Sequence, residues 1–146
     1  MLLGIFPLIS PELLAVLYRM GHGDKVVQAD VHFPGENYGK RVLRTDGLKI
    51  PNLLDAILPL FVLDNYGESP LIMMATVAGD QLDSAVEASY RHAIDKHWPN
   101  TPIIQRIDRF DFYERVGQAF AVIMTGETAK YGNIILKKGV TPITTK

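Results

Sequence analysis

Residues 70–78 have the sequence Pro-Leu-Ile-Met-Met-Ala-Thr-Val-Ala, a continuous apolar run bounded by Gly-Glu-Ser at 67–69 and by Gly-Asp at 79–80. A strand that is apolar along its whole length is typical of a sheet covered on both faces. Short strands of this kind alternate with helical segments along the chain, which is the pattern of a layered α/β protein. We therefore expect a single three-layer domain over residues 1–146, with a mixed β-sheet flanked by helices.

Helix caps and turn residues divide the rest of the chain into elements. The first helix is expected to begin after Ser10 and to end near Gly21, the second is expected to begin at Pro51, and Ser84 is expected to cap a third. A short fourth helix is expected over 110–117, with the third helix reaching residue 98, further strands over 25–31, 41–45, 102–107, 119–126 and 134–137, and a loop over 32–40.

Composition narrows the range of functions. The 15 Lys and Arg residues nearly balance the 16 Asp and Glu residues, so the chain lacks the positive field that captures nucleic acid. It contains no cysteine, which removes disulfides and thiolate chemistry and agrees with a cytoplasmic location. Residues 1–10 are apolar but too short to span a bilayer. We expect no membrane contact and a buried N-terminal segment.

The first candidate site surrounds His22, in the sequence Gly-His-Gly-Asp at 21–24. Asp30 ends the next predicted strand, and a loop imidazole and a strand-end carboxylate can meet at one edge of a sheet. Imidazole suits proton transfer near neutral pH. One alternative is that His22 is an ordinary surface turn residue. Another is a metal site in which His32 joins Asp30, with His22 and Asp24 nearby, although no ligand spacing of high specificity is present.

The second candidate is the run Arg-Phe-Asp-Phe-Tyr-Glu-Arg at 109–115. Arg109 and Tyr113 are four residues apart, so they face the same way on a helix. A guanidinium and a phenol can bind sugar hydroxyls, and the tyrosine ring can cover the apolar face of a pyranose. The alternative is that the aromatic residues are core anchors and the charged residues are solvated pairs.

The third candidate is the segment Tyr131-Gly132-Asn133. Glycine permits a close backbone approach, and the asparagine amide can both donate to and accept from a hydroxyl. The same tripeptide is also an ordinary hairpin turn. Neither glycine-rich stretch of the chain matches a phosphate-binding loop, so nucleotide binding is not supported.

The order of these motifs resembles the L-fucose mutarotase branch of a small sugar mutarotase family that also contains D-ribose pyranase. The resemblance covers most of the chain and is weakest over 35–40, in the third helix and its connection to residue 101, and in the polar tail 142–146. It rests on LISPELL (8–14), MGHGDKVVQAD (20–30), HFP (32–34), RTDGL (44–48), LPLFVLD (58–64), RFDFYER (109–115) and TGETAKYGNIILKKGV (125–140).

The resemblance implies a site without metal or cofactor. It assigns the acid/base role to His22, and we take Tyr113 as the second proton-transfer residue. The implied sugar contacts are Asp30, Asp64, Arg109, Tyr131, Gly132 and Asn133. Members of the family form ring-like homo-oligomers, commonly decamers, with sites at subunit contacts, so self-association is implied as well.

The expected function is that of an isomerase that interconverts the α and β anomers of L-fucose, and those of related pyranoses, by acid/base opening and closing of the sugar ring. D-ribose is the alternative substrate within the family. Two alternatives of another class are a non-catalytic sugar-binding module, which would leave anomer exchange at the buffer rate, and a metal-dependent hydrolase, which would lose its activity with a chelator.

Overall fold

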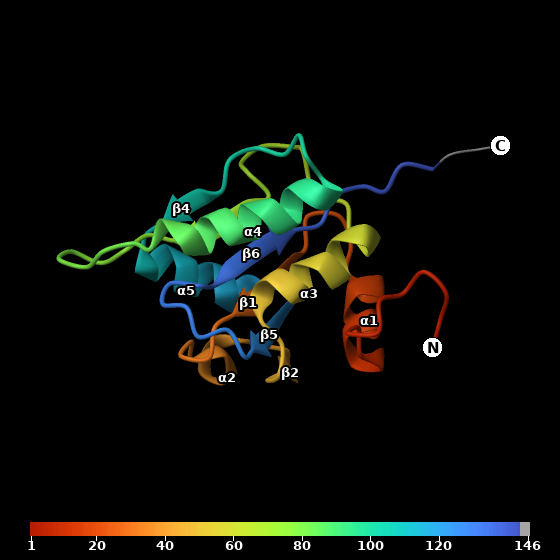
Figure 1. The fold of residues 1–146 in the computed structure, drawn as a ribbon, viewed down its shortest axis with the longest axis horizontal. Helices are drawn as coiled ribbons and strands as arrows, with labels where there is room; N and C mark the ends of the chain where they lie inside the picture. Colours follow the sequence, from red (N-terminus) through yellow and green to blue (C-terminus); the bar gives the residue numbers. More distant parts are fainter. Residues whose placement is uncertain (144–146) are drawn as a thin grey trace.

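A computed structural model describes residues 1–143, and residues 144–146 of the polar tail lie outside the described part. Six strands form one mixed sheet in the order β2-β5-β1-β6-β3-β4 (Figure 1). β5 is parallel to β1 and β2, and β3 is parallel to β4, whereas β6 is antiparallel to both of its neighbours. The strands are β1 Lys25–Ala29, β2 Val42–Thr45, β3 Leu71–Met74, β4 Gln105–Ile107, β5 Ala121–Thr125 and β6 Ile134–Lys137.

Helices cover both faces of this sheet, which confirms the predicted three-layer α/β architecture. The helices α1 Pro11–Arg19, α3 Ile50–Ile57 and α4 Ser84–His97 lie on one face, with a 3-10 turn over Leu58–Leu60 after α3 (Figure 1). The other face is covered by α2 Gly35–Tyr38 and α5 Arg109–Gln118. Two apolar cores therefore sandwich the sheet.

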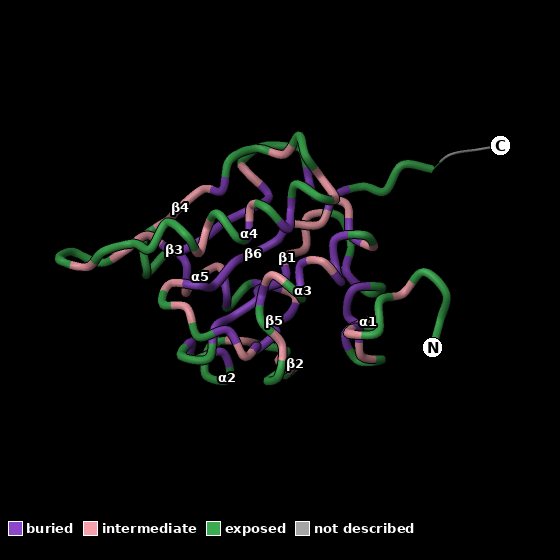
Figure 2. The backbone as a smooth tube through the Cα atoms, in the orientation of Figure 1, coloured by how far each residue is buried: buried purple, intermediate pink, exposed green. Residues whose placement is uncertain are grey.

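The buried residues follow the centre of the sheet (Figure 2). Along β1, Val26 belongs to the core under α3 and α4, and Val27 belongs to the core under α5. All four residues of β3 are buried, as the apolar run predicted. Full burial of each large aliphatic side chain contributes roughly 1.5–3 kcal/mol to stability. The strand is shorter than predicted, however, because its partner β4 ends at Ile107 and the chain then enters an exposed loop before α4.

Element boundaries differ from the predictions where side-chain caps act. Asp83 rather than Ser84 caps α4, since its carboxylate accepts the backbone N–H of Ala85 at 3.0 Å. Asp108 caps α5 in the same way, so that helix begins at Arg109. The predicted loop over 32–40 contains the single turn of α2. The other predicted elements are present with their ends shifted by a few residues.

The prediction of a buried N-terminal segment is wrong for most of its length. Met1 and Leu3 are fully exposed, and Leu2 and Phe6 are at least half exposed. Ile9 is buried in the core, and Ile5 and Leu8 are partly buried against it. Gly4 has a positive φ of 77°, and the chain turns there. The segment before α1 forms a loop on the outside of the molecule (Figure 1). Among residues 1–143, no helix combines the length and apolar character needed to cross a membrane.

Candidate functional site

A cavity of about 250 Å³ opens beyond the carboxyl ends of β1, β3 and β4. Ligands of open α/β sheets bind at this edge, where loops from several strands meet. Because β6 runs the opposite way, its first residues also reach this edge. Five residues predicted from the sequence line the cavity, namely Asp30, Arg109, Tyr113, Tyr131 and Asn133.

Asp30 is fixed by backbone and side-chain contacts on the floor of the cavity. Its backbone N–H donates to Oδ1 of Asn133 at 2.8 Å. Its carboxylate accepts the N–H of His32 at 3.0 Å and the N–H of Gly132 at 3.1 Å. Burial raises the pKa of Asp30 above its usual value, and these N–H donors oppose the rise. A carboxylate with two ordered donors and one buried face is suited to hold a hydroxyl in a fixed position.

Gly132 lies where no side chain would fit. Its carbonyl accepts the buried hydroxyl of Tyr90 at 2.7 Å, and an added Cβ would lie 2.8 Å from the carbonyl oxygen of Ala129. The hairpin alternative for 131–133 is wrong, because β1 separates β5 from β6 in the sheet. The tripeptide is instead a crossing segment that delivers Asn133 to the end of β1.

Tyr131 ties this segment to the loop between β3 and α4. Its φ of 58° is a left-handed conformation that side-chain-bearing residues rarely adopt. Its hydroxyl donates to Oδ2 of Asp80 at 2.8 Å and accepts the N–H of Val77 at 3.3 Å. Lys130 pairs with the same carboxylate at 2.7 Å. The loop that carries Val77 therefore forms one wall of the cavity.

Arg109 and Tyr113 both face the cavity from α5, as their spacing predicted. The ring of Tyr113 packs against Phe33 at 5.5 Å and Tyr38 at 4.9 Å between centroids. The core-anchor alternative holds for Phe112, which is fully buried, and in part for the half-buried Tyr113, which packs against the same core. It is wrong for Phe110, which is exposed, and Arg109 is exposed as well. A cation and a phenol thus stand at the mouth of the cavity.

His22 lies at the opposite end of the sheet. His22 comes before β1 and Asp30 comes directly after β1. The five residues of this strand span roughly 17 Å at about 3.3 Å per residue, and that length separates the two side chains. The predicted meeting of His22 and Asp30 at one edge is therefore wrong within a single chain. Strand direction is the reason, since residues before and after one strand lie at opposite edges.

Asp64 is the partner of His22 in this structure. Nε2 of His22 lies 3.1 Å from Oδ1 of Asp64, and the ring of Tyr66 contacts the imidazole edge-on at 5.6 Å. Burial would raise the pKa of Asp64, but contacts with Lys137 and His22 and the N–H of Tyr66 outweigh it and hold that pKa below its usual value. An ionised carboxylate only accepts hydrogen bonds, so a neutral His22 carries its proton on Nε2 and exposes the lone pair of Nδ1.

The metal alternative finds no matching geometry. Within residues 1–143, no three His, Cys, Asp or Glu side chains are grouped closely enough to hold an ion.

Comparison with known proteins gives the family of the chain. Residues 3–141 match the model of the RbsD / FucU transport protein family. The chain belongs to this family. Two proteins named L-fucose mutarotase are similar to it over nearly its whole length. The protein from Histophilus somni (strain 2336) is 57% identical over 143 residues, which is 98% of this chain and 99% of that protein. The protein from Glaesserella parasuis serovar 5 is 56% identical over 145 residues, with 99% of each covered.

Solved structures of RbsD / FucU relatives share the fold. The fucose mutarotase of Streptococcus pneumoniae, solved in complex with L-fucose, matches with a TM-score of 0.90 and 44% identity over 97% of this chain and all of that one. Bacillus subtilis RbsD, solved with D-ribose, matches with a TM-score of 0.70 and 22% identity over 97% of this chain and 99% of that one. The second likeness shows the fold alone.

In this RbsD / FucU chain Asp64 differs from its predicted role as a sugar contact. Its side chain is only 1% exposed and its oxygens face His22 and Lys137, so it is placed to orient the imidazole. Sequence reasoning missed Lys137 and Asp80. No local pattern pairs either residue with its partner, because Lys137 on β6 meets Asp64 from a distant loop and Asp80 meets Tyr131 across two loops. The one available signal for Lys137 was that two lysines, Lys137 and Lys138, end the apolar strand of TGETAKYGNIILKK.

Proposed function

We propose that this chain is an L-fucose mutarotase, a single-domain isomerase over residues 1–146 that interconverts the α and β anomers of the sugar. The observation that carries the proposal is the 56–57% identity, over nearly the whole chain, to proteins named L-fucose mutarotase. The similarity to the Streptococcus pneumoniae protein solved with L-fucose supports the same substrate. We also propose a cytoplasmic location, with which the absence of cysteine agrees.

The reaction needs only proton transfer. One proton reaches the ring oxygen and another leaves the anomeric hydroxyl, which gives the open aldehyde, and rotation about C1–C2 followed by reclosure gives the other anomer. His22 is the proposed proton-transfer residue, acting through Nδ1, and Tyr113 is its proposed partner. Positioned acid–base groups contribute about 10²–10⁴-fold each, or roughly 3–5 kcal/mol of barrier. Asp30, Arg109, Tyr131, Gly132 and Asn133 are the proposed sugar contacts.

Because His22 and Asp30 lie at opposite ends of the sheet, we propose that two copies of the chain form each site. A complete site requires the His22 end of one copy to meet the Asp30 end of another. Such a contact joins two different surfaces, and heterologous contacts of this kind close into rings when the rotation permits. The exposed apolar residues at the N-terminus provide further surface for a second copy. We propose a ring-like homo-oligomer, a decamer by resemblance to the family, with each site shared between neighbours.

Saturation-transfer NMR on reducing sugars tests the activity. The protein is expected to accelerate anomer exchange of L-fucose more than that of D-ribose, D-galactose or L-arabinose, with or without EDTA. His22→Gln should abolish the acceleration, whereas His92→Gln, at an exposed position on α4, should not. Preference for ribose, loss of activity in EDTA, or sugar binding without acceleration would each contradict the proposal.

Mixed assembly tests the shared site. His22→Gln and Asp30→Asn variants should each be inactive alone. After dissociation and reassembly at equal amounts, about a quarter of the contacts in a head-to-tail ring should join an intact His22 to an intact Asp30. Recovery of about a quarter of the wild-type activity is therefore expected. A mixture that stays inactive while forming mixed oligomers would place both residues in one chain's site and reject the shared arrangement.

A further inference from the structure

The carboxylate of Asp64 is divided between two kinds of partner. Oδ1 contacts Nε2 of His22 at 3.1 Å and accepts the N–H of Tyr66 at 3.3 Å. Oδ2 is buried and has one charged neighbour in the described part of the chain, Nζ of Lys137 at 3.1 Å. The side chain of Asp64 is 1% exposed and that of Lys137 is 21% exposed. The carboxylate of this ion pair is thus shielded from water. Attraction between the two charges is stronger there than at a fully exposed site, because the local dielectric constant is lower.

The place of Asp64 in the fold does not depend on the lysine side chain. The backbone N–H of Asp64 donates to the carbonyl of Lys137 at 2.9 Å, and Leu63 forms a bridge with Lys138. These contacts place the main chain of Asp64 beside His22 whatever side chain residue 137 carries. The ammonium group of Lys137 therefore compensates the charge of the carboxylate and is not needed to place the main chain.

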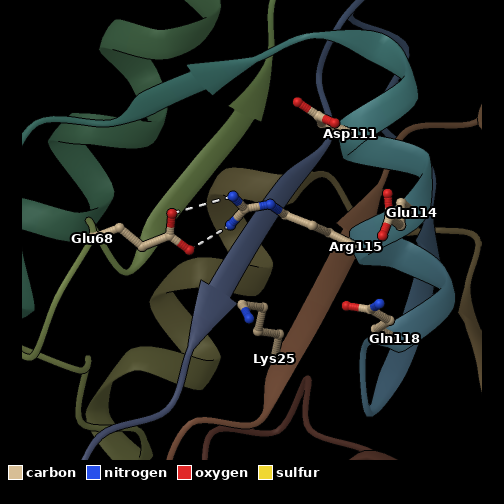
Figure 3. A pocket seen from close by; sticks show the side chains of 6 residues that line it. All are labelled: Lys25, Glu68, Asp111, Glu114, Arg115 and Gln118. Carbon is tan, nitrogen blue, oxygen red and sulfur yellow. Dashed lines mark hydrogen bonds and ion pairs between the residues drawn. The ribbon is translucent and has the colours of Figure 1, made fainter.

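A second lysine offers an internal comparison. Lys25 is directly opposite Lys137 in the β1–β6 pair, and opposed residues in an antiparallel pair share a face of the sheet. Lys25 lines a cleft of about 380 Å³ beside Arg115, whose guanidinium holds both oxygens of Glu68 (Figure 3). Burial, Lys137 and Arg115 lower the pKa of Lys25. Lys25 makes no ion pair with any residue in 1–143, Asp64 included.

We propose that Lys137 is a positioning residue for the mutarotase reaction: its ammonium group keeps Asp64 ionised, so that Asp64 holds Nε2–H of His22 and leaves Nδ1 free for the sugar. This inference rests on the proposed function of His22. Among residues 1–143, the side chain of Lys137 has no hydrogen bond or ion pair with the imidazole or with the proposed sugar contacts. It acts through the carboxylate alone.

The charge balance around the pair sets the direction of the effect. Loss of the Lys137 cation leaves the Asp64–His22 pair with a stronger hold on an added proton, whichever of the two groups receives it. The midpoint of the pair's titration should therefore rise by about one pH unit, the size expected for a neighbouring unit charge near a surface. The other charged or titratable groups on the packed elements are Asp24, Lys25, Tyr66, Glu68, Arg115 and Lys138.

The test compares Lys137→Met, Lys137→Arg and Lys25→Met in the full-length protein. The first readout is an NMR titration of the His22 imidazole without sugar, assigned with the His22→Gln variant. The second is the pH profile of L-fucose exchange. In Lys137→Met the imidazole midpoint and the rising limb of exchange should both move up by about one unit, whereas Lys25→Met should move neither and Lys137→Arg should restore both.

The two readouts separate the two proposals. A shifted imidazole midpoint in a protein that never accelerates exchange would reject the mutarotase but keep the link between Lys137 and His22. An unmoved midpoint in a folded Lys137→Met protein would overturn the link between Lys137 and His22. An equal shift in Lys25→Met would overturn it too, because any nearby positive charge would then have the same effect. If Lys137→Met fails to fold, an unshifted midpoint with unshifted exchange in Lys137→Gln would overturn it equally.

Discussion

The side-chain oxygen of Asn133 accepts the backbone N–H of Asp30 at 2.8 Å, joining two residues that are 103 positions apart in the chain. Both residues are almost fully buried. The bond closes the end of β1 onto the start of β6, and the carboxylate of Asp30 in turn accepts the N–H of Gly132. The floor of the cavity is therefore a hydrogen-bonded unit, and its geometry is set by the pairing of two antiparallel strands.

Replacing Asn133 with Ala should destabilise the protein. The N–H of Asp30 would be left buried without its acceptor, which costs about 1–3 kcal/mol. Urea unfolding followed by circular dichroism measures the change, with Asn100→Ala at an exposed turn as the control. Equal stability of the two variants would show that the Asn133 bond is dispensable for the fold.

The Tyr113→Phe variant separates chemistry from packing. The ring contacts with Phe33 and Tyr38 are kept, so stability should change by less than about 0.5 kcal/mol. If the phenol transfers a proton, fucose exchange should fall by about 100-fold or more. Tyr38→Phe, which removes a hydroxyl from the adjacent ring, should leave exchange nearly unchanged. Exchange that survives in Tyr113→Phe would argue that the residue only packs.

Asp80 should control sugar affinity through Tyr131. Contacts with Lys130, Tyr131 and the N–H of Gln81 lower the pKa of Asp80 from 3.8 to about 2. Because the pKa is depressed in the folded protein, the stabilising contact is present above pH 4 and is lost only as the pH falls toward 2. Asp80→Ala should therefore raise KM about 3–10-fold at both pH 5 and pH 7, with kcat little changed.

NMR exchange measured against sugar concentration gives both constants for Asp80→Ala. Gln81→Ala is a suitable control, because Gln81 meets Asp80 only through its own backbone N–H. A KM effect present at pH 7 and absent at pH 5 would contradict the assigned ionisation, and an unchanged KM would detach the loop from sugar binding.

The exposed N-terminus should matter for assembly rather than for folding. The double variant Leu3→Ser/Phe6→Ser removes two exposed apolar side chains that belong to neither core. Light scattering should report a smaller assembly, while the thermal unfolding temperature of the subunit fold stays close to wild type. Ile103→Ser changes an exposed apolar residue elsewhere and should preserve the assembly. An unchanged mass for the double variant would remove this segment from the proposed interface.

The sequence alone was sufficient for the local features of this protein. Capping at Ser10, the all-apolar run of β3 and the four-residue spacing of Arg109 and Tyr113 are short-range patterns, and each predicted its element or face correctly. The class of fold followed from the alternation of strands and helices. These features depend on neighbouring residues, so local physical chemistry is enough to predict them.

Only the tertiary structure decided which residues meet. His22 pairs with Asp64 rather than Asp30, Lys137 faces the same carboxylate, and Asn133 reaches Asp30 because β6 enters the sheet antiparallel between β1 and β3. Strand order and direction arise from contacts between distant segments, and they determine the edge of the sheet at which each strand end lies. No local pattern of residues contains that information.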